Sequence, residues 1–407
     1  MSRLSEFLNN LSPTKQYLLV RTYFDSAIYV FDAYYMTYVF KENGRVQDVV
    51  VNILITLVTF FVFFLLGSIF MNRVGVENNL RTSFLLYVFT GLFGIYLVHI
   101  GAMSFVLISL ARGAAEGFYW ASSHTIELSG LPHDSRSKLY SISYAINGVF
   151  TVVAPVTLGY LLAKSNSLLP AFVVFTAICL LAVITPYQFN INKKLSLHRN
   201  SFTEILKNPK LGSFVAVKLT ISAYWMIDWL VLSIIPFVVL GNELNMGIYL
   251  TISSLFGVVI SFATHKLTVQ QKAKLGGPLL VIMVLADIIL ALYFNPYMLY
   301  INAILTALIF SVVAPLENDM SARITNHLDP AAKIPVELNI FMEFVYTIAR
   351  MLIGGLVLGI IATGISVILV LKILVILLAL FEIGNYLLSV KFLKYGRNAV
   401  INSATVN

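Results

Sequence analysis

Residues 21–32 place three charged side chains, Arg21, Asp25 and Asp32, inside a stretch apolar enough to cross a membrane. Asp25 and Asp32 are about two helical turns apart, so they share one helix face with Tyr29 between them. A charge in the hydrocarbon core costs at least about 2.5–3.5 kcal/mol. We therefore expect these carboxylates to face a water-filled or protein-lined interior, as groups of a transport pathway or proton relay do. The alternative is a structural ion pair with Arg21.

A second set of opposite charges lies one helical turn apart, at Arg112 and Glu116. This spacing lets the two side chains form an ion pair on one helix. One interpretation is that they only neutralise each other. The other is that Glu116 accepts a proton and Arg112 then changes partner. Trp120 follows Glu116 by one more turn, and a carboxylate beside an aromatic face suits an organic cation.

Two later apolar stretches carry charges as well. Asp228 stands among aromatic residues, with Tyr224 one turn before it on the same face. We expect Asp228 to face the interior of the protein. Glu343 and Arg350 share one face of a later helix. They are predicted either to form a tie that breaks during a conformational change or to form a static one.

Other chemistries find little support. Two histidines and two acids follow Trp120, but their spacing matches no metal-ligand pattern. We therefore expect a solvated loop and no metal at His124, Glu127, His133 and Asp134. No Gly-x-Ser-x-Gly elbow or Walker-type loop is present, so we expect no enzyme, no cofactor and no direct use of ATP. The one cysteine excludes a disulfide within the chain.

The composition is that of an integral membrane protein. Of the 407 residues, 59% are hydrophobic and 11% are charged, whereas a soluble domain has about 25% charged residues. The net charge of +8 comes without any nucleic-acid-binding motif, so we expect no nucleic acid partner. The partners that fit are the lipid bilayer, protons and a small-molecule substrate.

Twelve apolar runs approach the length of about 20 residues that a membrane span requires. We place them at residues 16–39, 48–70, 82–101, 103–123, 138–163, 168–188, 212–240, 245–265, 277–294, 296–316, 336–362 and 366–392. With twelve spans, nineteen loop and terminal basic residues fall on the side of the termini, and three fall on the other side, at Lys41, Arg45 and Lys164. The positive-inside rule then puts both termini in the cytoplasm.

The chain divides into two similar halves. We predict a bundle of six spans over residues 1–188, a cytoplasmic linker with an amphipathic helix over 189–211, and a second bundle over 212–407. The first span carries Arg21 before Asp32, and the seventh carries Lys218 before Asp228 at nearly the same spacing. Such an echo is typical of transporter repeats. Lys218 is expected to extend its ammonium toward the interface.

Three motifs at matching places carry a family resemblance. The loop after the second span resembles the signature of the major facilitator superfamily, with Asn where the family usually has Asp. The fourth span resembles that family's Arg-bearing helix, and the fifth is similar to a Gly-Pro motif of its exporters. The resemblance implies an all-α fold of two pseudo-symmetric six-helix bundles that alternate access to a central cavity. It also implies gate roles for Ser68, Asn72, Arg73, Gly75 and Pro155.

We predict a proton-coupled exporter of small amphipathic or cationic organic compounds or peptides, working as an antiporter. Acids slightly outnumber bases within the spans, which favours cationic solutes over anions. An uptake symporter for a nutrient stays open, as does a lipid flippase or a non-transporting membrane partner. We expect a monomer in the plasma or inner membrane.

Overall fold

The computed structural model describes the backbone of residues 11–101, 103–127, 133–185, 189, 205–207, 211–264, 266–328 and 335–404. It describes the side chains of the same residues except 33, 133–146, 213, 214, 269, 310, 314–328, 335, 389 and 391–404. The predicted linker therefore lies almost entirely outside the described residues, and the domain limits at 188 and 212 stay predictions.

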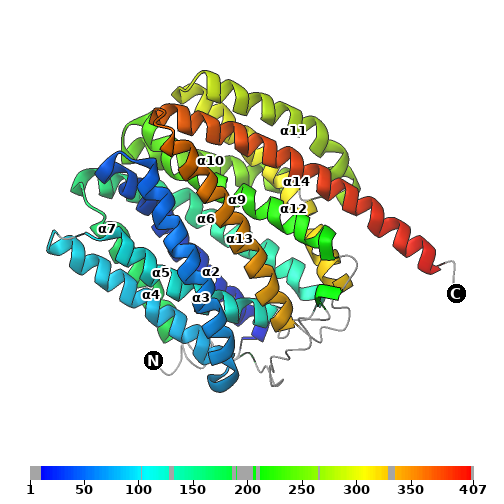
Figure 1. The fold of residues 1–407 in the computed structure, drawn as a ribbon. Coiled ribbons are helices and arrows are strands. Elements are labelled where there is room, and N and C mark those ends of the chain that lie inside the picture. Colours follow the sequence, from blue (N-terminus) through cyan, green and yellow to red (C-terminus); the bar gives the residue numbers. More distant parts are fainter. Residues whose placement is uncertain are drawn as a thin grey trace.

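Twelve long helices make up most of this part of the chain (Figure 1). They are α2 (Pro13–Asn43), α3 (Val46–Val74), α4 (Val76–His99), α5 (Phe105–Thr125), α6 (His133–Ser165), α7 (Leu169–Ile184), α9 (Leu211–Leu240), α10 (Glu243–Thr264), α11 (Val269–Leu292), α12 (Pro296–Leu328), α13 (Pro335–Ala362) and α14 (Val367–Ala404).

Each predicted span overlaps one of these helices, although the limits of several differ. Within the described ranges, nine helices are long and apolar enough to cross a membrane. The other three are α7, which has 16 residues, and α2 and α5, which carry Arg21, Asp25 and Asp32 and Arg112 and Glu116, respectively. The protein is a multi-pass membrane protein with an all-α fold. Which side of the membrane the termini occupy stays a prediction.

The helices group into two bundles. Helices α2–α7 pack on one another, and so do α9–α14. In Figure 1 the blue and cyan helices occupy one side of the molecule, whereas α11, α12 and α14 occupy the other. Two long seams join the bundles, with α6 packed along α10 and α3 along α13. Helix α2 also contacts α9, which brings the first and seventh spans together at the centre.

Close packing of α5 on α3 positions the charged face of α5. A Cβ atom on Gly113 would lie 2.5 Å from the carbonyl oxygen of Thr56, and one on Gly117 would lie 2.5 Å from the backbone nitrogen of Phe64. Small residues four apart allow two membrane helices to approach to this distance. With this face against α3, the preceding residues Arg112 and Glu116 point elsewhere, toward α2 and the interior.

Candidate functional site

Arg112 binds two carboxylates at once. Its Nη1 atom lies 2.6 Å from Oδ1 of Asp32, and its Nη2 donates to Oδ2 of Asp32 at 2.8 Å. Its Nε donates to Oε1 of Glu116 at 2.7 Å. We call Asp32, Arg112 and Glu116 the Arg112 cluster. Two carboxylates and one guanidinium give it a formal charge of −1 when both acids are ionised.

The three members of the Arg112 cluster differ in access. The side chain of Arg112 is 4% exposed and that of Asp32 is 30% exposed. Glu116 is buried, and the Arg112 guanidinium also lies 5.5 Å from the centre of the Phe31 ring. Asp32 is therefore the most accessible member of the cluster. The predicted pair of Arg112 and Glu116 is present, and Arg112 also pairs with Asp32 on α2.

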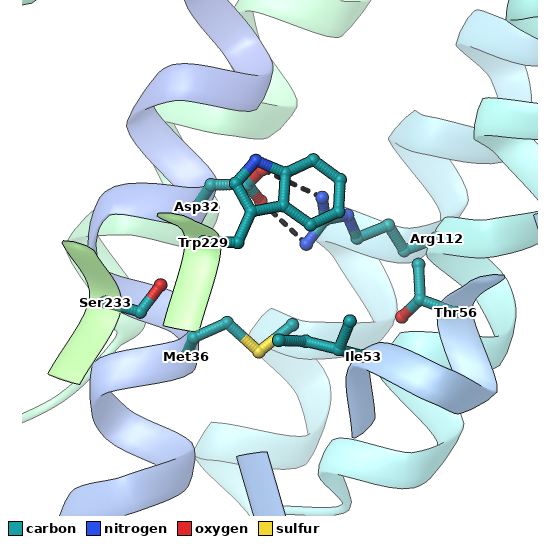
Figure 2. Close-up of a pocket in the computed structure, with 7 residues that line it drawn as sticks. All are labelled: Asp32, Met36, Ile53, Thr56, Arg112, Trp229 and Ser233. Carbon is teal, nitrogen blue, oxygen red and sulfur yellow. Dashed lines mark hydrogen bonds and ion pairs between the residues drawn. The ribbon is translucent and has the colours of Figure 1, made fainter. Parts of the chain in front are cut away.

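A small hollow adjoins this cluster between the two bundles. It is lined by Asp32, Met36, Ile53, Thr56, Arg112, Trp229 and Ser233. Figure 2 shows Trp229 on the α9 side, over the ion pair of Asp32 and Arg112. The volume of the hollow is about 40 Å³. Since a water needs roughly 10–15 Å³ of such space, the hollow takes a few waters, and it must widen to take an organic solute.

Arg350, on α13, lies next to Trp229, which lines the hollow. Its guanidinium carbon lies 5.6 Å from the centre of the Trp229 ring and 5.8 Å from that of Tyr346. Its Nε is buried without a hydrogen-bond partner in the described part of the chain. The Lys218 ammonium lies 5.3 Å from the Tyr346 ring. Lys218 is 2% exposed, so its predicted extension to the interface is wrong.

Arg21 and Asp25 form the ion pair that was the alternative interpretation of this stretch, because Arg21 Nε lies 3.0 Å from Asp25 Oδ1. Asn147 on α6 donates to Oδ2 of Asp25 at 2.7 Å. Arg21 also lies 5.0 Å from the centre of the Trp120 ring. The aromatic face that we expected to receive an organic cation thus receives the protein's own guanidinium.

His124 and Glu127 belong to this ionic network, so the expected solvated loop is wrong at both positions. Nη1 of Arg21 lies 3.3 Å from Oε1 of Glu127, and the hydroxyl of Tyr17 donates to the same oxygen at 2.6 Å. Burial by itself raises the pKa of Glu127, but the hydrogen bond with His124 and the charge of Arg21 outweigh it and lower that pKa to about 2. The side chains of His133 and Asp134 lie outside the described residues.

Glu343 contacts His124 in the other bundle. Nε2 of His124 lies 3.3 Å from Oε1 of Glu343, whose side chain is 8% exposed. This contact joins α5 to α13. Glu343 and Arg350 share a face of α13, yet the described partner of Glu343 is His124 and that of Arg350 is a pair of rings. We call the side of the molecule that holds this contact the His124 end.

A second ionic contact joins the bundles at the opposite side, which we call the Lys41 end. Nζ of Lys41 lies 2.6 Å from Oε1 of Glu243 and donates to Oδ1 of Asn166 at 2.8 Å. The hydroxyl of Thr37 donates to the carbonyl of Ser233 at 2.7 Å. Sequence reasoning missed this set, because Lys41 and Glu243 stand at helix ends and read as loop charges. The sequence held one signal, because Lys41 is among only three loop basic residues that were predicted on the side of the membrane opposite the termini.

The remaining predicted site residues are dispersed. The hydroxyl of Tyr29 lies 3.3 Å from Oγ of Ser254 on α10, so this residue also links the bundles. Asp228 and Tyr224 are both buried, each 8% exposed. Neither is among the residues that line the hollow. A proton-loading role for Asp228 stays a prediction.

The gate motif lies at the junction of α3 and α4. Ser68 is buried and its hydroxyl donates to the carbonyl of Phe64 at 2.8 Å, within its own helix. Asn72 and Arg73 are exposed. Gly75 has a φ of +86°, a conformation that favours glycine and ends one helix as the next begins. Pro155 lies apart from these, inside α6, where its carbonyl accepts a hydrogen bond from Tyr34.

The chain has recognisable relatives. Residues 20–335 match the family model described as Major Facilitator Superfamily. None of the curated proteins compared with the chain matches it.

Solved structures share the fold across nearly the whole chain. The E. coli fucose:proton symporter matches at 12% identity with a TM-score of 0.63, covering 94% of this chain and 99% of that one. The POT family transporter PepTSo matches at 11% identity with a TM-score of 0.66, covering 96% and 99%. A D-xylose-proton symporter matches at 15% identity with a TM-score of 0.62, covering 90% and 96%. At these identities the likeness concerns the fold alone.

Proposed function

Since this chain belongs to the Major Facilitator Superfamily, and is therefore a transporter, we propose that it is a proton-coupled exporter. It exchanges protons for small amphipathic or cationic organic compounds or peptides by alternating access. The single observation that carries the proposal is the sharing of Arg112 between Asp32 and Glu116.

The charge of the Arg112 cluster makes it a one-proton switch. With both acids ionised the cluster has a net charge of −1 inside the membrane, which is unfavourable. One proton on either acid makes it neutral. A cationic group of a solute does the same from outside the cluster. Proton and cation thus compete for one negative site, and binding of one favours release of the other, which is the requirement for antiport.

Asp32 is the acid that serves this exchange. Its side chain is the most exposed of the cluster and lines the hollow. When Asp32 takes a proton, Arg112 keeps its bond to Glu116, so the guanidinium does not lose its last counter-ion. The buried Glu116 therefore holds Arg112 in place through the cycle.

The contacts at the two ends of the molecule support alternating access. The pair of Lys41 and Glu243 closes one end, and the contact of His124 with Glu343 lies toward the other. Each joins one bundle to the other, so opening either end breaks one of them. The small hollow between them fits a state in which the solute site is closed.

The test is transport by the full chain in proteoliposomes under an imposed pH gradient, with a trapped pH-sensitive dye. A panel of organic cations and small peptides is added from one side. The proposal predicts that some compounds drive protons in the opposite direction. Asp32→Asn abolishes this movement, whereas Glu42→Gln, which removes an exposed acid from the same helix, retains it. Proton movement in the same direction as the solute would identify a symporter instead and contradict export by antiport.

A further inference from the structure

Arg350 is a cation in the membrane interior with aromatic partners and no described acidic one. Its guanidinium lies near the faces of Trp229 and Tyr346. No carboxylate oxygen of the described side chains lies within ion-pair distance of it, and its Nε has no hydrogen-bond partner there. Arg21 and Arg112, by contrast, each contact two carboxylates.

Aromatic faces do not satisfy a guanidinium completely. They attract its charge, but the N–H groups of arginine lie in its own plane and need oxygen acceptors. Planar, rigid donors of this kind match a carboxylate, which accepts two parallel hydrogen bonds. The two rings hold the group, and its Nε has no acceptor among the described residues.

Trp229 connects Arg350 with the hollow. The indole lines the hollow and also lies 5.6 Å from the Arg350 guanidinium, so one ring separates this cation from the space beside Asp32. Asp32 and Arg112 belong to the other bundle (Figure 2). A solute in a widened hollow therefore has the Asp32 carboxylate on one side and, next to Trp229, the Arg350 guanidinium on the other.

We infer that Arg350 binds a carboxylate group of the transported solute. The inference rests on the proposed function, because it takes the hollow as the place of the solute. With a cationic group beside Asp32, the solute is a zwitterion that spans the two bundles. Binding its two ends draws the bundles together, which couples occupancy to closure.

Trp229 provides the measurement. The chain has three tryptophans, so Trp120→Phe with Trp225→Phe leaves Trp229 as the single fluorophore of its kind in the full chain. The probes are L-phenylalanine and L-phenylalaninamide, which share the amine and the ring and differ in the carboxylate. Benzoate and benzamide form a second matched pair without the amine. Fluorescence of Trp229 is followed during titration of each probe.

We expect saturable changes with L-phenylalanine and benzoate and weaker or absent changes with the two amides. Arg350→Gln weakens binding of the carboxylates about tenfold or more, as loss of a charge-assisted hydrogen bond does. Arg350→Lys retains part of the affinity for the carboxylates. Lys372→Gln, which removes a cation that donates to the carbonyl of Leu292, leaves it unchanged. Melting curves show whether each variant is folded.

Equal responses to acid and amide, equal affinity in Arg350→Gln, or no saturable response to either carboxylate would overturn the inference. These outcomes are separate from failure of the proposed function. Carboxylate binding that depends on Arg350 without any solute-driven proton movement would contradict proton coupling alone. Proton movement without a carboxylate preference would contradict the role of Arg350 alone.

Discussion

Asp32 and Arg112 are 80 positions apart in the chain, yet two of their atom pairs lie 2.6 Å and 2.8 Å apart. Both residues belong to the same bundle, so their ion pair does not have to break when the bundles move relative to each other. Under the proposed function, the bond changes instead with the charge of Asp32. Trp229 of α9, in the other bundle, lines the same hollow as this ion pair (Figure 2).

Arg112→Gln should destabilise the protein strongly. Removing the guanidinium leaves two carboxylates beside each other in the membrane interior, and breaking such a buried pair costs about 3–5 kcal/mol. The melting temperature of the purified protein measures the effect. Arg45→Gln, at an exposed position, should change it little. Adding Asp32→Asn to Arg112→Gln should recover part of the loss, and purely additive losses would contradict the direct coupling of the two residues.

Lys41→Gln should favour opening at the Lys41 end, because it removes the ionic contact between α2 and α10. Spin labels on exposed residues of the two bundles measure this, for example at Asn43 and Tyr297, after Cys179→Ala. The distance between the labels should lengthen in Lys41→Gln and return in the exchanged pair Lys41→Glu with Glu243→Lys. Lys164→Gln, another exposed lysine, is the control. The same distances in all variants would show that the pair does not hold this end closed.

Gly247→Ala should disturb the seam between α6 and α10. A Cβ atom there would collide with the carbonyl oxygen of Pro155 and lie 2.7 Å from the hydroxyl of Tyr34. Because the first of these atoms is backbone, the helices must separate, at a cost of about 1–3 kcal/mol. The matched control is Gly257→Ala on the same helix, where the nearest atom lies 3.9 Å away. Gly257→Ala should be neutral or slightly stabilising. Equal melting temperatures for the two variants would contradict the close packing of this seam.

Glu127 should stabilise the protein in a pH-dependent manner. Its pKa is lowered from 4.5 to about 2, so the native state favours the ionised carboxylate. The stabilisation is complete above about 4.5 and is lost as the pH falls toward about 2. The difference in melting temperature between the parent protein and Glu127→Gln should therefore be largest near neutrality and shrink in acid. A difference in melting temperature that grows as the pH falls would contradict stabilisation by the ionised Glu127 carboxylate.

The sequence predicted what hydropathy and local spacing control. Twelve helices follow from twelve apolar runs, and the pairs of Arg21 with Asp25 and of Arg112 with Glu116 follow from four-residue spacing on one helix. Contacts between helices did not follow, because spacing says nothing about which helix lies opposite. The partner of Arg112 on α2 and the partner of Glu343 on α5 both needed the tertiary packing.

His124 and Glu127 are a second case in which local sequence did not reveal tertiary contacts. Their spacing from His133 and Asp134 matches no metal-ligand pattern, so a solvated loop was expected there. In the structure His124 lies at the end of α5 and contacts α13, and Glu127, two residues beyond α5, contacts Arg21 of α2. Their neighbours are Arg21 and Glu343, which are far away in the sequence. Local composition could not distinguish this buried network from a hydrated turn.

The central claim is that Asp32 couples protons to the solute without being required for movement of the solute itself. The direct test compares two assays of Asp32→Asn in proteoliposomes, using a compound that the parent protein transports. One is exchange of labelled for unlabelled solute without a pH gradient, and the other is accumulation driven by the gradient. The account predicts that exchange persists while driven accumulation is lost. Driven accumulation at the parental level would contradict it.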